Sequence, residues 1–253
     1  MACFRFRMKK ERIDKLLQEF GFVDSSAKAR ALVMAGSVLV NEKRVNKPSE
    51  SFPLNAQIRV KGETLESRYV GRGGLKLEKA LSDFHICPDG YVCLDVGSST
   101  GGFTDCLLKH GAGKVVAIDV GTNQIVWGLR NDPRVEVREN TNARNLATGD
   151  FNEKFDIAVM DVSFISVKML LPVLIPLLKD EGKIITLIKP QFEVGKGEVG
   201  NGGIVREPEK QDRVVYEINQ FALAAGLRVI GVIESPIFGA AGNREFLALY
   251  GKR

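Results

Sequence analysis

The sequence predicts an α/β protein in which a parallel sheet covered by helices on both faces follows a smaller α+β unit. In the later part of the chain, apolar strand-like runs alternate with helical stretches, which is typical of such a sheet. In the first part, two helical patterns precede short strands. A composition of 44% hydrophobic and 26% charged residues over 253 residues supports a globular protein with a real core.

The first unit is expected to begin with two helices. Apolar residues recur at helical spacing from Ile13 to Phe20, and the pattern stops at Gly21. A second helix is expected to start at Ser25 or Ser26 and to end at Gly36, because Ser favours a helix start and Gly a helix end. The two helices form one unit of a small domain.

Short strands should complete this unit. Val38 to Val40, the polar turn Asn41 to Lys43 and then Val45 predict a hairpin, and Ile58 to Val60 predicts a further strand. The charged segment Lys61 to Arg68 has little apolar content and is expected to be the linker. We therefore expect a small domain over residues 1–66, with the linker at its end, and a larger domain over residues 67–253.

The larger domain carries the strand-like runs of the expected parallel sheet. Each run is rich in apolar and β-branched residues, and helical stretches separate the runs. These predicted strands are Tyr91 to Val96, Val115 to Asp119, Val135 to Arg138, Phe155 to Asp161 and Lys183 to Ile188.

The positive charge of the chain is concentrated in the small domain. Residues 1–68 hold 14 Lys and Arg against 8 Asp and Glu, so this segment carries +6, while the whole chain carries +5. A small basic domain favours nucleic acid as a partner, because phosphate neutralisation releases counterions. Charge alone is also compatible with a role in solubility.

Cysteine usage and hydropathy exclude several classes of protein. The four cysteines, Cys3, Cys87, Cys93 and Cys106, form no CxxC pair, so we expect no metal site and interpret them as reduced packing thiols of a cytoplasmic protein. The longest apolar run, Met169 to Leu178, is too short for a bilayer and contains two prolines. Secretion and membrane insertion are therefore not expected.

A glycine-rich turn between a strand and a helix predicts a cofactor site. The segment from Cys93 to Phe103 reads CLDVGSSTGGF and places an acid before the turn, where ligands bind in open α/β sheets. Glycine lets a ligand approach the backbone closely. A tight turn without a ligand is the alternative interpretation of the turn taken alone.

The acids around this turn favour S-adenosylmethionine over a dinucleotide. Asp119 ends the next strand, where a carboxylate can accept the hydroxyls of a ribose. The turn lacks the G-x-G-x-x-G spacing of nicotinamide enzymes. Asp95 would repel a pyrophosphate but would attract the cationic amino group and sulfonium of S-adenosylmethionine.

Two more charged residues end apolar strands and are candidates for chemistry. Asp161 follows IAVM and Lys189 follows IITLI, so both are expected to face the cleft above the sheet. A desolvated lysine next to another positive charge loses its proton more readily and can act as a base toward a ribose hydroxyl. An ordinary structural ion pair is the alternative for a single strand-end lysine.

Five motifs in this chain resemble those of the TlyA family, also called hemolysin A. They are Arg72-Gly73-Gly74-Leu75-Lys76-Leu77, Asp95 to Phe103, Asp161-Val162-Ser163-Phe164-Ile165, Lys189-Pro190-Gln191-Phe192-Glu193 and Gly242-Asn243-Arg244-Glu245-Phe246. The resemblance covers nearly the whole chain. It implies an S4-like RNA-binding domain before a Rossmann-like S-adenosylmethionine-dependent methyltransferase fold with a seven-stranded, mostly parallel sheet.

The resemblance also implies a catalytic tetrad like that of FtsJ-like 2'-O-methyltransferases, formed by Lys76, Asp161, Lys189 and Glu245. On this mapping Lys189 deprotonates the 2'-hydroxyl and Asp161 orients Lys189. Lys76 and Glu245 hold the ribose. The reaction is expected to need no metal ion.

The cofactor contacts of the family map onto the turn, the next strand end and the segment after the third strand. They are Asp95, Gly97, Ser98, Ser99, Thr100, Gly101, Gly102, Phe103, Asp119, Asn142 and Ala143. Asn142 is alternatively a turn residue that holds its own backbone. The glycine-rich segment Gly195 to Gly203 either closes over RNA or is a plain surface loop.

The expected partner is ribosomal RNA, free or within ribosomal subunits, because the family modifies cytidines of rRNA; no protein partner is implied. Basic residues of the small domain are expected to follow phosphates along folded RNA, since few aromatic residues lie among them. These residues are Arg12, Lys15, Lys28, Arg30, Lys43 and Arg44.

Two other classes of function compete with this interpretation. A pore-forming hemolysin would need a membrane-inserting segment and would have no use for a cofactor cleft. A non-catalytic RNA-binding module would have no reason to keep all four tetrad residues. The sequence therefore favours the methyltransferase.

Overall fold

The computed structural model describes residues 10–20, 22–23, 25–54, 56, 58–60, 68–195, 197–239 and 242–253. Apart from Arg68, the predicted linker lies outside the described residues. The helices are α1 Ile13–Glu19, α2 Ser26–Met34, α3 Gly73–Asp83, α4 Gly102–Lys109, α5 Trp127–Arg130, α6 Leu171–Leu174, α7 Pro190–Glu193 and α8 Pro208–Ala224. The strands are β1 Lys10–Arg12, β2 Val38–Val40, β3 Lys43–Arg44, β4 Ser51–Pro53, β5 Ile58–Val60, β6 Val92–Val96, β7 Lys114–Ile118, β8 Val135–Arg138, β9 Phe155–Met160, β10 Leu178–Ile188, β11 Leu227–Glu234 and β12 Phe246–Lys252.

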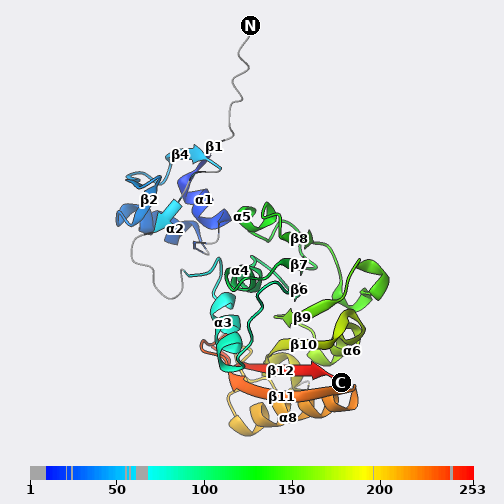
Figure 1. Cartoon of the computed structure of the whole chain (residues 1–253). Coiled ribbons are helices and arrows are strands. Elements are labelled where there is room, and N and C mark those ends of the chain that lie inside the picture. The colour runs from blue at the N-terminus through cyan, green and yellow to red at the C-terminus, as the bar shows by residue number, and fades with distance from the viewer. Residues whose placement is uncertain are drawn as a thin grey trace.

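The small domain packs α1 and α2 against a three-stranded sheet with the order β3-β2-β5 (Figure 1). Its core joins the inner faces of both helices to β2, around the buried side chains of Ile13, Leu17 and Val33. Both predicted helices and the hairpin are confirmed. The antiparallel pair formed by β1 and β4 was not predicted from the sequence.

Seven strands form the sheet of the large domain in the order β11-β12-β10-β9-β6-β7-β8. Strands β10, β9, β6, β7 and β8 run parallel, and β12 is antiparallel to both β10 and β11. This is the predicted mostly parallel, Rossmann-like sheet. The carboxyl ends of β6, β7, β9 and β10 consequently lie along one edge.

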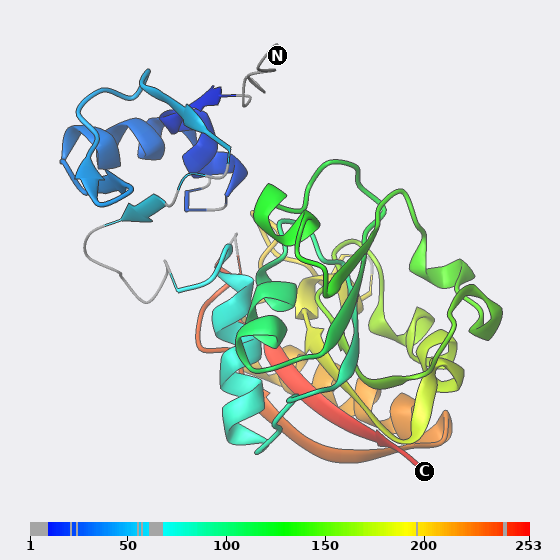
Figure 2. The same cartoon turned by 45° about the horizontal axis from the view of Figure 1, so that its top comes forward.

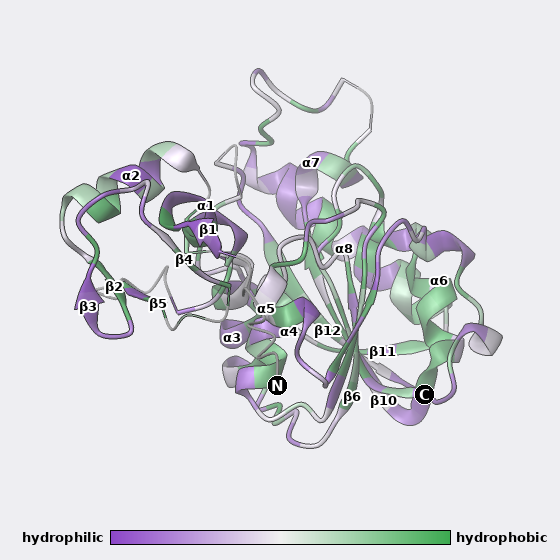
Figure 3. Ribbon diagram, turned by 90° about the horizontal axis from the view of Figure 1, so that it is seen from above, coloured by the Kyte–Doolittle hydropathy of each residue, from purple (hydrophilic) through white to green (hydrophobic). Residues whose placement is uncertain are grey.

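Helices cover both faces of this sheet, as Figure 2 and Figure 3 show. One face packs against α6 and α8 through residues such as Val96, Met160 and Ile218. The other face packs against α3, α4 and α5 through residues such as Leu77 and Leu107. Burial of apolar surface on both faces explains why the strands are nearly continuous apolar runs.

The cysteines follow the expectation only in part. Cys93 and Cys106 are buried, and burial raises the pKa of each thiol to about 12, so both are packing thiols. Cys87 is exposed, and the prediction that it packs in the core is wrong. It lies in the irregular segment between α3 and β6. Cys3 lies outside the described residues. Among the residues described, no helix has the length and apolarity needed to cross a membrane.

The segment before α3 fixes the position of that helix. The backbone N–H of Val70 donates to Asp105 Oδ2 of α4 at 2.9 Å. Tyr69 is only 4% exposed and packs against Gly74, where a Cβ atom would lie 2.3 Å from the ring. The start of α3 therefore depends on a residue without a side chain at position 74.

Replacing Gly74 by Ala should lower the free energy of unfolding by about 1–3 kcal/mol, because the added methyl group overlaps the buried Tyr69 ring. Urea unfolding measures this change. The matched control is Gly128→Ala in α5, where a Cβ would meet no atom within 4 Å, and we expect no loss there. Equal stability of the two variants would contradict the packing argument.

Candidate active site

Two adjoining cavities lie at the carboxyl ends of the parallel strands. The larger, of about 410 Å³, is bounded by the turn after β6, the end of β7 and the segments after β8 and β9. The smaller, of about 240 Å³, lies between that turn, residues 71–73 and the end of β10. Both include Gly97, Ser99, Asp161 and Ser163 in their linings. The strand topology thus places one continuous cleft where the sequence predicts a ligand.

The turn after β6 has a backbone that two glycines make possible. Gly97 has φ +82°, and a Cβ there would lie 2.5 Å from the backbone oxygen of Asp161. Gly101 has φ +102° and precedes α4, and a Cβ there would collide with Leu129. The N–H of Gly101 closes the turn by donating to the oxygen of Ser98 at 2.8 Å. The positive φ angles, the nearby backbone of Asp161 and the nearby side chain of Leu129 require these glycines even without a ligand.

Asp119 connects the glycine turn to the loop that follows β7. Its Oδ2 accepts the N–H of Ser99 and its Oδ1 accepts the N–H of Gly121, each at 2.8 Å. The carboxylate lines the larger cavity beside Gln124. Each carboxylate oxygen keeps a further lone pair for a donor such as a ribose hydroxyl.

Asp95 lies beneath the turn and outside the linings of both cavities. It is fully buried, and its Oδ2 accepts the hydroxyl of Thr104 at 2.6 Å. Its Oδ1 has no hydrogen-bond partner. Burial raises the pKa of this carboxyl group to about 7, and the charge of Asp161 adds to the rise, while the Thr104 hydrogen bond opposes it. The predicted direct contact of Asp95 with a cofactor stays a prediction.

Asn142 caps its own turn and also borders the larger cavity, and its contact with a cofactor stays a prediction. It lines the larger cavity together with Ala143. Its Oδ1 also accepts the backbone N–H of Arg144 at 3.1 Å, so it caps its own turn. Thr141 and Gln124 line the same cavity and were missed, because neither belongs to a recognisable motif.

The four predicted catalytic residues form one connected network. Lys189 Nζ lies 2.6 Å from Asp161 Oδ1, and Lys76 Nζ lies 4.0 Å from Asp161 Oδ2. Lys76 Nζ also donates to Glu245 Oε2 at 2.6 Å. Lys76, Lys189 and Glu245 are 8%, 9% and 3% exposed. Three of the four charged residues are therefore buried, and the half-buried Asp161 lies between the two lysines.

Ser163 and Phe164 have places in this site that the sequence analysis did not assign. Lys189 Nζ donates to Ser163 Oγ at 3.0 Å, which gives the ammonium group a second fixed partner. Phe164 is 89% exposed, has φ +64° and stacks loosely on Phe192, with ring centroids 5.0 Å apart. An exposed aromatic ring in a strained backbone conformation is a surface on which a nucleobase could stack.

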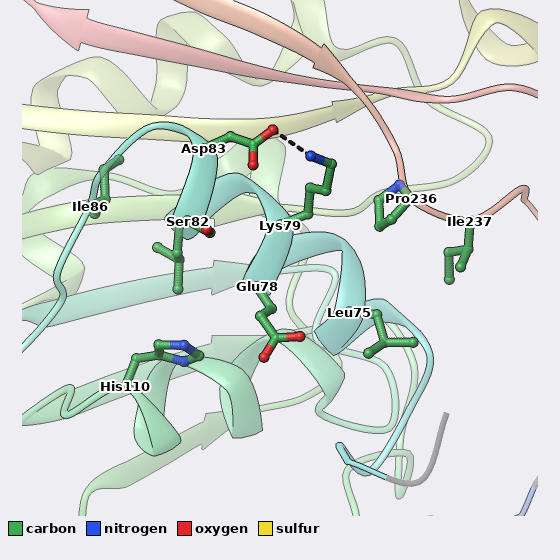
Figure 4. A pocket seen from close by; sticks show the side chains of 10 residues that line it. Leu75, Glu78, Lys79, Ser82, Asp83, Ile86, His110, Pro236 and Ile237 are labelled. Carbon is green, nitrogen blue, oxygen red and sulfur yellow. Dashed lines mark hydrogen bonds and ion pairs between the residues drawn. The ribbon is translucent and has the colours of Figure 1, made fainter. Parts of the chain in front are cut away.

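A further cavity lies elsewhere, along the outer side of α3 (Figure 4). It measures about 740 Å³ and is lined by residues such as Leu75, Ile86 and Ile237. Its charges already have partners, since Lys79 pairs with Asp83 at 2.5 Å and Glu78 pairs with Arg68. None of the four network residues lines it. We therefore place the chemistry in the smaller, charged cleft.

The predicted RNA-binding residues lie on the small domain, and acidic neighbours occupy several of them. Arg12 and Arg30 both approach Asp14, at 2.7 and 3.7 Å, and Lys15 lies 3.6 Å from Glu11. Lys28 lies in the first turn of α2. Lys43 and Arg44 form β3, and the Arg44 guanidinium covers Gly36. Their contact with RNA stays a prediction.

The glycine-rich segment after α7 is tied to the start of β12. Asn243 Oδ1 accepts the N–H of Val205 at 3.0 Å, and Asn243 Nδ2 donates to the oxygen of Gly203 at 2.9 Å. Glu198 also pairs with Arg213 of α8. Closure of this segment over RNA stays a prediction.

Two protein-family models match the chain. The FtsJ-like methyltransferase model matches residues 69–252, and the S4 domain model matches residues 11–58. The first match contains the sheet and all four network residues. The second contains α1, α2 and β2 to β4.

Relatives match along almost the whole chain. The 16S/23S rRNA (cytidine-2'-O)-methyltransferase TlyA of Mycobacterium tuberculosis is 42% identical over 94% of this chain and 88% of its own length. Hemolysin A of Brachyspira hyodysenteriae is 41% identical over 94% of this chain and 98% of its own length. A solved structure from Streptococcus thermophilus that carries a hemolysin name superposes with a TM-score of 0.73 at 45% identity and covers 97% of this chain and 89% of its own.

The stability of the protein without ligand should depend on pH through Asp95. Its pKa of about 7 in the folded state exceeds the ordinary value of 3.8, so between these values the folded state binds more protons than the unfolded state. The free energy of unfolding should therefore fall as pH rises from about 4 to about 7. Urea unfolding across this range should give a shallower fall for Asp95→Asn. If the free energy of unfolding fell equally with pH in both proteins, Asp95 would not be the group responsible.

Proposed function

Because the chain belongs to the FtsJ-like methyltransferase family and resembles TlyA along nearly its whole length, we propose that it methylates the 2'-hydroxyl of cytidine in ribosomal RNA. The methyl donor is S-adenosylmethionine, which supplies an electrophilic methyl group on a sulfonium. The substrate is rRNA of the large subunit, with the small subunit as a further target. The site of action is the cytoplasm.

One observation carries this proposal: a buried network of two lysines and two carboxylates adjoins a cleft that fits a nucleoside. Lys189 Nζ lies 2.6 Å from Asp161 and 3.0 Å from Ser163, and Lys189 lines the smaller cavity. An isolated structural ion pair would not need a second lysine and a second carboxylate at the same place. A lysine that accepts the proton of a weakly acidic ribose hydroxyl must be held in place by neighbouring groups such as these.

The cleft has the features that the methyl donor requires. Gly97 leaves backbone atoms uncovered where a Cβ would intrude, and Asp119 presents carboxylate oxygens at the end of β7. We assign the ribose of the donor to Asp119 and its adenine side to Asn142 and Ala143. Asp95 acts from beneath the turn through the segment Gly97 to Phe103.

The residues of the network have separate tasks in the transfer. Lys189, in its neutral form, accepts the proton of the 2'-hydroxyl, so that the oxygen can bond to the methyl carbon while the carbon–sulfur bond breaks. Asp161 orients the Lys189 amine. Lys76 and Glu245 hold the ribose. Alignment of nucleophile and methyl group supplies most of the acceleration, and the base contributes about 10²–10⁴-fold.

The two domains divide recognition from chemistry. We propose that residues 1–66 hold folded rRNA by phosphate contacts from Arg12, Lys15, Lys28, Arg30, Lys43 and Arg44, and that residues 67–253 carry the reaction. The match of the S4 domain model to residues 11–58 supports this division. Phosphate contacts of this kind weaken as salt increases.

Replacing Lys189 by Ala should reduce methyl transfer to rRNA by at least about 100-fold, because the proton acceptor is lost. Affinity for S-adenosylmethionine should change little, because Asp119 and the glycine turn remain. Transfer of radiolabelled methyl groups to ribosomal subunits that lack the modification measures the first effect, and calorimetry measures the second.

The exposed Lys154, which lines neither cavity, provides the control, and Lys154→Ala should retain full transfer. Loss of cofactor binding in Lys189→Ala would refute the division of tasks. Absence of transfer by the unaltered protein to any form of rRNA would refute the proposed substrate.

A further inference from the structure

The loop between β7 and α5 forms one wall of the cofactor cleft. Val120 and Gln124 of this loop line the larger cavity. The N–H of Val126 donates to the oxygen of Thr100 at 3.1 Å, and the side chain of Ile125 lies 3.1 Å from where a Cβ of Gly101 would be. The loop therefore contacts both the larger cavity and the glycine turn. A change in its backbone conformation would change the shape of the cavity.

A single carboxylate holds the backbone of this loop. Glu139, directly after β8, accepts the N–H groups of Asn123 and Gln124 at 2.8 Å and that of Ile125 at 3.3 Å. Asn123 has φ +55°, a conformation that costs a non-glycine residue free energy unless its surroundings impose it. Three consecutive N–H groups that point at one carboxylate supply that constraint.

The charge of Glu139 is permanent at any working pH. Its side chain is only 12% exposed, and Arg130 of α5 donates to its Oε1 at 2.6 Å. This hydrogen bond is the largest cause that lowers the pKa of Glu139 to about 2, and the three backbone N–H groups lower it further. Arg130 and the loop thus share one acceptor, and the acceptor ties α5 to the loop.

We propose that Glu139 is a positioning residue for the methyl donor: it fixes the 120–126 loop in the shape that binds the cofactor. This inference rests on the proposed function, because it assigns the cleft to S-adenosylmethionine. Glu139 lines neither cavity and acts through Gln124 and the glycine turn. The competing explanation is that Glu139 contributes only to the stability of the fold. The two explanations predict different effects of substitutions at Glu139 and Arg130 on cofactor binding.

The test compares Glu139→Gln with Arg130→Gln. Glutamine keeps the length of Glu139 but replaces one acceptor oxygen by an N–H donor, which faces the donors of the loop. Arg130→Gln removes the ionic partner and leaves the carboxylate of Glu139 in place to accept all three backbone N–H groups. Glu136→Gln on β8, whose side chain pairs with Arg138 and Lys114 outside the loop, is the control for loss of a charge.

Binding of S-adenosylmethionine is measured by calorimetry and by the fluorescence of Trp127, the single tryptophan of the chain and the first residue of α5. We expect Kd to rise at least about tenfold in Glu139→Gln, with kcat at saturating cofactor within about twofold of the unaltered protein. In Arg130→Gln and Glu136→Gln, Kd should stay within about threefold. Glu139→Asp, which keeps the charge but withdraws it from the loop, should give an intermediate Kd.

Several results would overturn the inference. An unchanged Kd in Glu139→Gln would do so directly. An equal rise in Kd for Glu139→Gln and Arg130→Gln would assign the effect to the ion pair and to stability. A fall in kcat at saturating cofactor, with Kd unchanged, would place Glu139 in the chemical step. If Glu139→Gln fails to fold, Glu139→Asp decides on the same criteria. If the unaltered protein itself binds no S-adenosylmethionine, the proposed function fails and this role falls with it.

Discussion

Within the described residues, the large domain depends on a network of four charges that neutralise one another, three of them buried and one half-buried. Lys76, Asp161, Lys189 and Glu245 come from α3, the end of β9, the end of β10 and the start of β12, and the two lysines balance the two carboxylates. Removing one partner would leave a charge without compensation in a site that is largely closed to water. The order of the strands and the position of α3 are therefore tied to the chemistry. The backbone of Asp161 also abuts Gly97, which joins the network to the cofactor turn.

Local patterns predicted the elements whose residues are contiguous. Strands β6 to β10 and helices α1 and α2 followed from periodicity and from Ser and Gly at helix ends. Periodicity could not supply the bond between Lys76 and Glu245, which spans 169 positions of sequence, and only the resemblance to a family brought these residues together. The role of Glu139 was missed for a similar reason, because its three partners are backbone groups that no residue pattern marks.

Relatives of this chain carry two kinds of name, methyltransferase and hemolysin. A membrane-active protein would gain nothing from buried lysines that face a cleft, and their desolvation would cost it stability. A group-transfer enzyme needs such groups, because a hydroxyl must lose its proton at the moment of attack. The physical chemistry of the site therefore favours a methyltransferase over a membrane-active hemolysin.

We propose that the network of Lys76, Asp161, Lys189 and Glu245 directs the methyl group to a ribose hydroxyl. This proposal is tested most directly by digesting rRNA methylated by the protein to nucleosides and identifying the product by mass spectrometry. We expect 2'-O-methylcytidine, with the added mass on the sugar and an unmodified base. A methyl group found on the base would contradict this prediction, because the lysine–carboxylate network is assigned to the ribose hydroxyl.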